Sequence, residues 1–171
     1  TLFWRNSNLN FNNPLSLIRS LEEKPKMGWL RKIHECEDEK ALKYFLKEKS
    51  FINLEFNKKL LSLLWECCQI PDFVKKTYGN HYEVIGNVFK YLSSGKHQIT
   101  DEFMRLQLIK LDKLEGNVDS LSNRIANVRT WSYVSNKNNW TENQDYWIEK
   151  TKHLEDRLSD RLHEELTKTF I

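Results

Sequence analysis

The scarcity of glycine and proline most constrains what this chain can fold into: its 171 residues include 5 glycines and 3 prolines. Together these two types make up about 12% of an average protein, because they form tight turns and end regular elements. A fold of many short strands needs many such turns, and phosphate-binding loops need several glycines close together. The sequence therefore predicts an all-α protein without a glycine-rich nucleotide-binding loop.

Apolar residues recur at helical spacing along most of the chain, and several segments have recognisable ends. A first helix is expected from Pro14, capped by Asn13 and stopped by Pro25, and a second begins with the acidic residues 37–39. Asn117 and Asp119 are alternative caps for a later helix. Further helices are expected over 60–70, 78–92 and 100–114, and the helix capped by Asn117 or Asp119 is expected to run to residue 134. The weakly alternating segment 51–56 is compatible with a short strand or with a helical connector, and 1–12 and 25–35 are expected to be irregular.

The last expected helix is the longest. The tetrapeptide 141–144 (TENQ) matches a capping box, and an apolar stripe follows on an otherwise charged helix. The chain is thus predicted to be an irregular bundle of about seven helices ending in a long amphipathic C-terminal helix. We interpret residues 1–50 as an N-terminal helical segment and 51–171 as a C-terminal helical domain, packed together as one unit. The stripe consists of Trp147, Thr151, Leu154, Leu158, Leu162 and Leu166.

Charge and cysteine content limit the cellular context. Lys and Arg number 27 against 24 Asp and Glu, and this excess of +3 lies in residues 1–85. A domain that binds nucleic acid by charge alone has a larger excess of basic residues, with a pI above about 9, so this chain is not expected to bind in that way. No run of 18 apolar residues is present, so no membrane segment is expected. Three cysteines, two of them vicinal, predict reduced thiols and a cytoplasmic location.

The sequence contains no phosphate-binding loop, dinucleotide fingerprint, HExxH or CxxC motif. His34-Glu35-Cys36 resembles a fragment of a metal site, and Cys67-Cys68 offers further sulfur. Zinc sites, however, need ligand pairs two to four residues apart, and a second pair is missing. Burial of Cys67 and Cys68 is the preferred interpretation, since free cysteine is among the most buried residue types. No catalytic, cofactor or metal site is therefore predicted in this chain.

One cluster combines aromatic and basic side chains near the end of the helix that precedes residue 134. Guanidinium and amine groups could contact phosphates while a ring stacks on a base. The alternative is that Trp131 is a core residue with the cations around it, which we prefer for Trp131 and leave open for the arginines. The predicted nucleic-acid contacts are Arg124, Arg129 and Lys137.

Four segments carry a resemblance to a known family. Residues 64–73 (LWECCQIPDF) resemble its LWExCQIPDF signature, and residues 124–134 (RIANVRTWSYV) resemble RIAGIRTWTYVA. Residues 154–167 (LEDRLSDRLHEELT) are similar to LEDRLSDALHERLT, and residues 2–6 are similar to the exit from its second RecA-like domain. The family comprises bacterial relatives of the mitochondrial degradosome RNA helicase, a DExH-type member of superfamily 2. One departure is Asn127, where the family has glycine.

The resemblance implies a C-terminal accessory region of an ATP-dependent helicase that unwinds structured RNA or RNA/DNA duplexes ahead of an exoribonuclease. ATP and Mg²⁺ would bind the upstream RecA-like motor domains, so this chain alone is expected to be non-catalytic. Its expected role is to help enclose single-stranded nucleic acid and guide it along the motor. The alternative is a protein-interaction module that docks a ribonuclease or a second protomer through its charged C-terminal helix. The lack of a site disfavours a freestanding enzyme.

Overall fold

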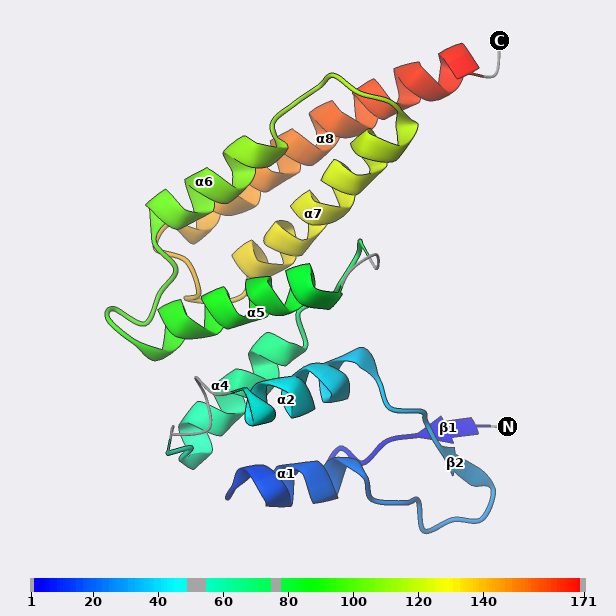
Figure 1. The fold of residues 1–171 in the computed structure, drawn as a ribbon, viewed down its shortest axis with the longest axis vertical. Coiled ribbons are helices and arrows are strands. Elements are labelled where there is room, and N and C mark those ends of the chain that lie inside the picture. The colour runs from blue at the N-terminus through cyan, green and yellow to red at the C-terminus, as the bar shows by residue number, and fades with distance from the viewer. Residues whose placement is uncertain (1, 49–54, 75–77, 170–171) are drawn as a thin grey trace. The chain divides into compact units, whose positions relative to one another are not determined.

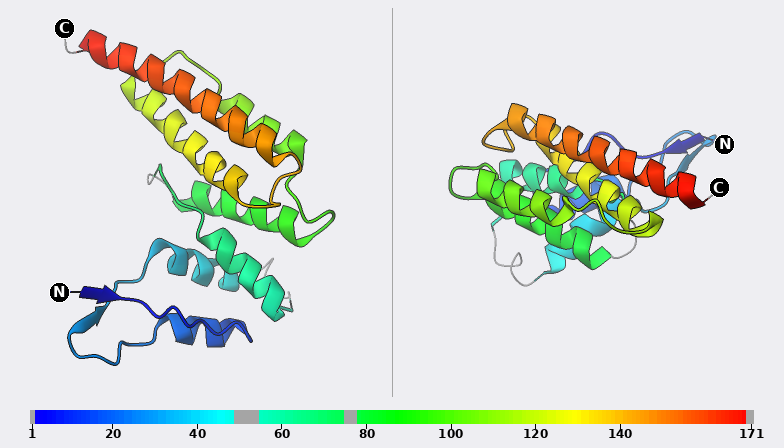
Figure 2. Two further views of the ribbon diagram at one scale, coloured as in Figure 1. Left: turned by 180° about the vertical axis from the view of Figure 1, so that it is seen from behind. Right: turned by 90° about the horizontal axis from the view of Figure 1, so that it is seen from above.

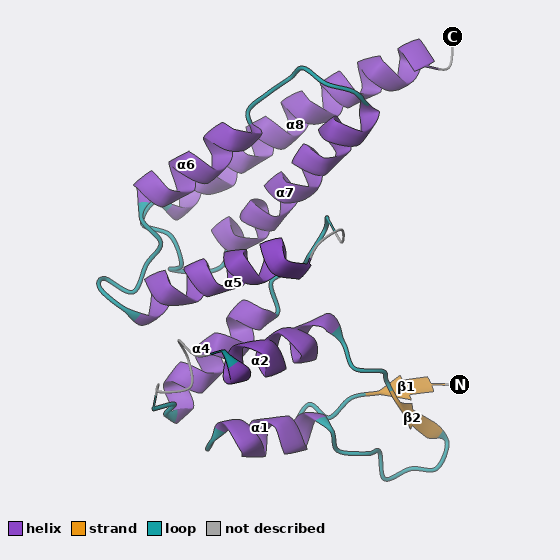
Figure 3. Cartoon of the chain, in the orientation of Figure 1, coloured by secondary structure: helices purple, strands orange, loops and turns teal. Residues whose placement is uncertain are grey.

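The computed structural model describes residues 2–48, 55–74 and 78–169, and within these ranges it contains seven helices and two three-residue strands (Figures 1 and 3). The all-α prediction is confirmed. Most of segment 51–56, with its two alternatives, lies outside the described residues. The elements are β1 (Leu2–Trp4), α1 (Pro14–Leu21), β2 (Leu30–Lys32), α2 (Glu37–Lys47), α4 (Lys58–Cys68), α5 (Tyr78–Ser93), α6 (Asp101–Leu111), α7 (Val118–Asn136) and α8 (Gln144–Thr169).

The chain divides into two compact units, Thr1–Gln69 and Ile70–Ile171. The boundary expected from the sequence, between residues 50 and 51, lies inside the first of them. The reason is packing: α4 buries one face against α2, so it joins the N-terminal elements. Its buried face includes Leu61, Leu64 and Trp65.

The two strands of the first unit correct the expectation that residues 1–12 and 25–35 are irregular. β1 and β2 pair in parallel, with Leu2 opposite Leu30, Phe3 opposite Arg31 and Trp4 opposite Lys32 (Figure 3). Three residues are too few to show an alternating pattern, and the partner strand lies 28 positions away in the sequence. The pairing is thus a tertiary contact without a local signal.

Asparagine caps begin two helices of the first unit. The Oδ1 atom of Asn13 accepts a hydrogen bond from the backbone N–H of Ser16 at 2.8 Å, and Pro14 follows at the first helical position, as predicted. Asn57 caps α4 in the same way through the N–H of Leu60 at 2.7 Å. The apolar side chains that α1, α2 and α4 bury are Leu17, Leu21, Ala41, Leu42, Phe45, Leu61, Leu64, Trp65, Cys67 and Cys68.

In the second unit α7 and α8 run side by side in each view (Figure 2), and their facing side chains form the core. The predicted stripe of α8 is buried as far as Leu158, whereas Leu162 and Leu166 are half-buried. None of the helices in the described part of the chain is both long and apolar enough to cross a bilayer. Buried core residues from the two helices include Leu121, Ile125, Val128, Trp131, Trp147, Leu154 and Leu158.

Aromatic contacts join the other two helices to this pair. The rings of Tyr91 on α5 and Phe103 on α6 meet edge to face with centroids 4.9 Å apart, and Phe103 lies 5.8 Å from Trp131 on α7. The interpretation of Trp131 as a core residue is therefore confirmed, since 4% of it is exposed. Edge-to-face pairs of this kind add about 0.5–1.5 kcal/mol beyond the burial of their area.

The end of α6 differs from the prediction of a helix to Leu114, because it ends at Leu111. The N–H of Lys113 turns back to the carbonyl of Leu111 at 2.9 Å, and residues 112–117 form a loop. Gly116 has a φ of +131°, which favours glycine, and Asn117 rather than Asp119 caps α7 by accepting from the N–H of Ser120.

The capping box predicted at residues 141–144 is wrong. α8 begins at Gln144, so Thr141 lies before the helix, where it forms a parallel bridge with Ile99. The carboxylate of Glu142 instead accepts from the backbone N–H of Asp101 at 2.8 Å, at the start of α6. The backbone bridge between these two loops holds Thr141 in place, and its buried hydroxyl caps no helix.

Candidate nucleic-acid interface

Arg124, the first predicted contact residue, holds the loop between α6 and α7. Its Nη1 atom donates to the carbonyl oxygens of Lys113 at 2.8 Å and of Glu115 at 2.5 Å. The guanidinium also lies beside Gly116. These hydrogen bonds direct the charged group to the backbone of its own chain, which gives Arg124 a structural role.

Arg129 lies on another side of α7 and is 56% exposed. Five residues turn a helix by about 140° relative to Arg124, so the two guanidinium groups do not share a face. The Nε atom of Arg129 contacts the carboxylate of Glu155 on α8 at 2.6 Å. An exposed pair of this kind contributes only about 0.2–1 kcal/mol, because solvent and salt screen it.

Lys137, just after α7, continues the side of the helix that carries Arg129. Arg129, Tyr133 and Lys137 follow one another at intervals of four residues, which places them on one stripe. The amine of Lys137 lies 5.6 Å from the ring centre of Tyr133 and 5.4 Å from that of Trp140. The structure thus places the Lys137 amine over the Tyr133 ring, with Arg129 one turn before Tyr133 on the same side of the helix, and leaves Arg124 apart. We call Arg129, Tyr133 and Lys137 the α7 stripe.

Two of the segments that carry the family resemblance meet in the second unit. The hydroxyl of Thr130 lies 3.4 Å from the carbonyl oxygen of Pro71, and Nε2 of His81 lies 2.9 Å from that of Ile70. A pocket of about 340 Å³ opens there, lined by polar groups that include Asp72 and Asn127. Asn127 donates from its amide to the carbonyl of Asn123 within α7, which suits asparagine at this helical position.

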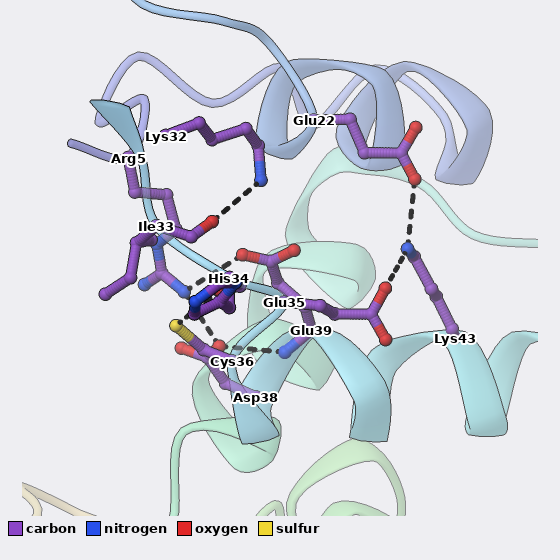
Figure 4. Close-up of polar contacts among 10 residues, drawn as sticks. All are labelled: Arg5, Glu22, Lys32, Ile33, His34, Glu35, Cys36, Asp38, Glu39 and Lys43. Atoms are coloured by element: carbon purple, nitrogen blue, oxygen red, sulfur yellow. Dashed lines mark hydrogen bonds and ion pairs between the residues drawn. The ribbon is translucent and has the colours of Figure 1, made fainter. Parts of the chain in front are cut away.

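In the first unit, Arg5 forms an ion cluster that the sequence did not reveal (Figure 4). Its guanidinium donates to the carboxylates of Asp38 at 2.8 Å and of Glu39 at 3.4 Å, and lies 5.5 Å from the ring centre of Trp65. The hydrogen bond that Arg5 donates to the Asp38 carboxylate raises the pKa of Arg5. Because Arg5, Asp38 and Trp65 come from three distant segments, sequence spacing gives no signal for this cluster.

Cys36 lies next to the same carboxylates, so the group offers three atoms of kinds that bind metals. The Cys36 sulfur and carboxylate oxygens of Asp38 and Glu39 lie within 4.8 Å of one another. The guanidinium of Arg5 already contacts both carboxylates and compensates part of their charge, so this donor set fits an ion pair better than a cation site. The neighbouring Glu35 faces away and binds the amine of Lys43 at 2.6 Å (Figure 4).

The vicinal cysteines are core residues, as predicted: 0% of Cys67 and 3% of Cys68 are exposed. Burial raises the pKa of the Cys68 thiol well above its ordinary value, which keeps it protonated at neutral pH. A protonated, inaccessible thiol is a poor nucleophile and a poor metal ligand. All three cysteines of the chain are thiols.

No protein-family model, curated protein or solved structure matches this chain.

Proposed function

We propose that this chain is a non-catalytic accessory domain of an ATP-dependent RNA helicase, which binds single-stranded nucleic acid and guides it along the motor. The α7 stripe, with the Lys137 amine over a half-buried tyrosine ring and the exposed Arg129 one helical turn away, is the observation that supports this proposal best. ATP and Mg²⁺ would act in the upstream RecA-like domains, as the resemblance implies. The three thiols support a cytoplasmic location.

The chemistry of the stripe suits a backbone that carries phosphates. Glu155 holds Arg129 through a weak exposed pair, so a phosphate could replace the carboxylate at low cost. The amine of Lys137 is held over two rings and can turn towards a second phosphate without losing a carboxylate partner. Tyr133 offers a ring on which a base can stack, an interaction worth about 1–3 kcal/mol per base.

The alternative, docking of a ribonuclease or second protomer through α8, has less support. The arginines that would carry this contact are engaged within the chain: Arg157 binds Asp112 at 2.9 Å and Arg161 binds Glu165 at 2.6 Å. If α8 is nevertheless the docking helix, reversing the charge of both arginines should abolish co-purification of the partner.

The proposal is tested by the affinity of the chain for a fluorescently labelled oligouridylate, measured by anisotropy over a series of salt concentrations. The double variant Arg129→Ala/Lys137→Ala should bind more weakly. Loss of two phosphate contacts should also make the slope of log K against log salt shallower by about 1.4, because each contact on a single strand contributes about 0.7.

Arg157→Ala is the matched control, since it removes one exposed arginine and one exposed ion pair from the same unit. Its affinity and salt slope should equal those of the wild type. The stripe is wrong as a binding site if the double variant behaves like this control.

A further inference from the structure

The net positive charge of the chain belongs to one unit. Residues 1–69 contain 12 basic and 9 acidic side chains, whereas residues 70–171 contain 15 of each. Within the first unit, segment 24–34 has four cations and no acidic residue. They are Lys24, Lys26, Arg31 and Lys32.

The acidic groups near this segment are already committed to other partners (Figure 4). Lys43 binds Glu22 at 3.0 Å and Glu35 at 2.6 Å. Arg5 binds the two carboxylates at the start of α2, and Glu23 accepts from the amide of Asn6 at 3.0 Å.

The cations of the segment are consequently left for solvent or a ligand. Among the described residues, no ion pair or side-chain hydrogen bond involves Lys24, Lys26 or Arg31, and all three are exposed. The amine of Lys32 contacts only a backbone carbonyl, that of Ile33 at 3.4 Å. In the second unit, by contrast, each arginine of α7 and α8 binds a carboxylate or backbone carbonyls of the same chain.

Two of the most exposed aromatic rings among the described residues lie within this segment or opposite it on the sheet. Phe3 is 61% exposed and Trp29 is 62% exposed. Phe3 and Arg31 are register partners on β1 and β2, so they stand side by side on one face of the sheet. Trp29 precedes β2 directly, at the end of the sheet where Leu2 faces Leu30.

We propose that this surface, made of Phe3, Trp29, Lys24, Lys26 and Arg31, binds single-stranded nucleic acid. We call it the N-terminal platform. Bases stack on the two rings, and phosphates contact the three cations, the combination that sequence-tolerant single-strand binding uses. The ligand class rests on the proposed function, but the residues are separate from the α7 stripe.

The positive charge of the N-terminal platform favours nucleic acid over a protein strand that would add to the open edge of the sheet. A strand pairing with β1 or β2 would satisfy backbone groups and cover the rings, yet it would leave the neighbouring cations without counter-charges. A polyanion with flat bases matches both features of the surface. A protein strand is therefore an alternative that the following experiment must reject.

The experiment measures binding of labelled oligouridylate to the full chain and to variants of the platform. Trp29→Ala and Phe3→Ala should each lower the affinity by about 5- to 100-fold, the range for loss of one stacked base. Trp29→Phe keeps a ring and should retain most of the affinity. Lys24→Ala/Lys26→Ala should make the salt slope shallower by about 1.4.

Tyr146→Ala is the matched control, because Tyr146 is a similarly exposed ring (56%) in the second unit and should be neutral. A second readout is collisional quenching by iodide: Trp29 is the most exposed of the six tryptophans, so bound oligouridylate should protect it. Circular dichroism should be unchanged in all variants, since the replaced side chains are exposed.

The outcomes separate the platform from the proposed function. Unchanged affinity of Trp29→Ala and Phe3→Ala, with weaker binding by the α7-stripe variant, would overturn the platform alone. Weaker binding by the platform variants, with an unaffected α7-stripe variant, would support the platform and reject the stripe. Lack of oligouridylate binding by the wild type would overturn both, and the sheet edge would then be tested with peptides.

Discussion

The two units use their charged groups in opposite ways. In residues 1–69, Arg5 and Lys43 hold four carboxylates, of which that of Glu39 is buried, while the loop cations Lys24, Lys26 and Arg31 are exposed. In residues 70–171, positive and negative groups balance in number, and surface pairs such as Arg129–Glu155 join neighbouring helices. A polyanion binds more readily to cations that have no internal partner than to cations whose ion pair must first be exchanged. The comparison therefore shows why a basic residue on a helix is a weaker indication of a site than one whose neighbouring acids are engaged elsewhere.

The ion pair of Arg5 with Glu39 and that of Arg129 with Glu155 also differ in how far they are buried. The side chain of Glu39 is 1% exposed, whereas both side chains of the Arg129–Glu155 pair are accessible to water. Charges that are withdrawn from water depend on their partner, because an uncompensated buried charge costs several kcal/mol. We thus expect removal of the Arg5 charge, which partners the buried Glu39, to be severe, and removal of a charge from an exposed pair to be mild in either unit.

The largest effect is expected from Arg5→Ala, which leaves the Glu39 carboxylate buried beside Asp38 without its cation. The free energy of unfolding should fall by about 3 kcal/mol or more, measured by urea denaturation followed by circular dichroism. Arg19→Ala, which removes an exposed arginine from the same unit, should cost less than about 0.5 kcal/mol. If Arg5→Ala and Arg19→Ala lose the same free energy of unfolding, burial of the Arg5 ion pair does not make its charge more important than that of a surface arginine.

A smaller effect is expected from Arg124→Ala in the second unit. The carbonyls of Lys113 and Glu115 would exchange their guanidinium donor for water, at a cost of about 1–2 kcal/mol. Affinity for oligouridylate should stay at the wild-type value, because the side chain faces its own loop. If Arg124→Ala binds oligouridylate more weakly but is as stable as the wild type, Arg124 contacts the nucleic acid and not its own loop.

The smallest effect, and one that depends on pH, is expected from Lys43→Met. The hydrogen bond between Glu35 and Lys43 lowers the pKa of Glu35 from its ordinary 4.5 and raises the pKa of Lys43 from its ordinary 10.5. The stability from the lowered carboxyl pKa is present above about pH 4.5 and is lost as the pH falls through the folded-state value. The contribution of Lys43 is lost as the pH rises through its raised pKa.

The wild type should therefore exceed Lys43→Met by less than about 1 kcal/mol between these limits, since the pair is partly exposed, and the difference should shrink in acid. Thermal unfolding at pH 7 and pH 3 measures it, with Lys47→Met as the matched control on the same helix. A difference that is independent of pH would show that Lys43 stabilises the unit by packing of its stem.

Helix identity could be predicted because it depends on local chemistry. Asn13, Pro14 and Asn117 act within one turn of their own helices, and the apolar stripes of α7 and α8 repeat at helical spacing. The predictions failed where a distant segment intervened. β1 needs β2 as its partner, and Thr141 pairs with Ile99 instead of capping α8.

The candidate sites follow the same division. The spacing of Arg129, Tyr133 and Lys137 on one stripe can be worked out from helical geometry. The sequence could not show that Arg124 turns to the preceding loop, because its acceptors are backbone carbonyls whose position depends on where α6 ends. Nor could it show the N-terminal platform, since Phe3 and Arg31 become neighbours only through strand pairing.

Local sequence patterns sufficed for the all-α class, as the few glycines and prolines first indicated, and for most of the starting points of the helices in the described residues. Those properties arise from interactions a few residues apart. The tertiary structure alone decided which cations have carboxylate partners, which aromatic rings are buried and where α6 and α8 meet their loops. Burial and ion pairing depend on distances between segments that local sequence patterns leave unspecified, and these same quantities decide whether a charged or aromatic side chain is available to a ligand.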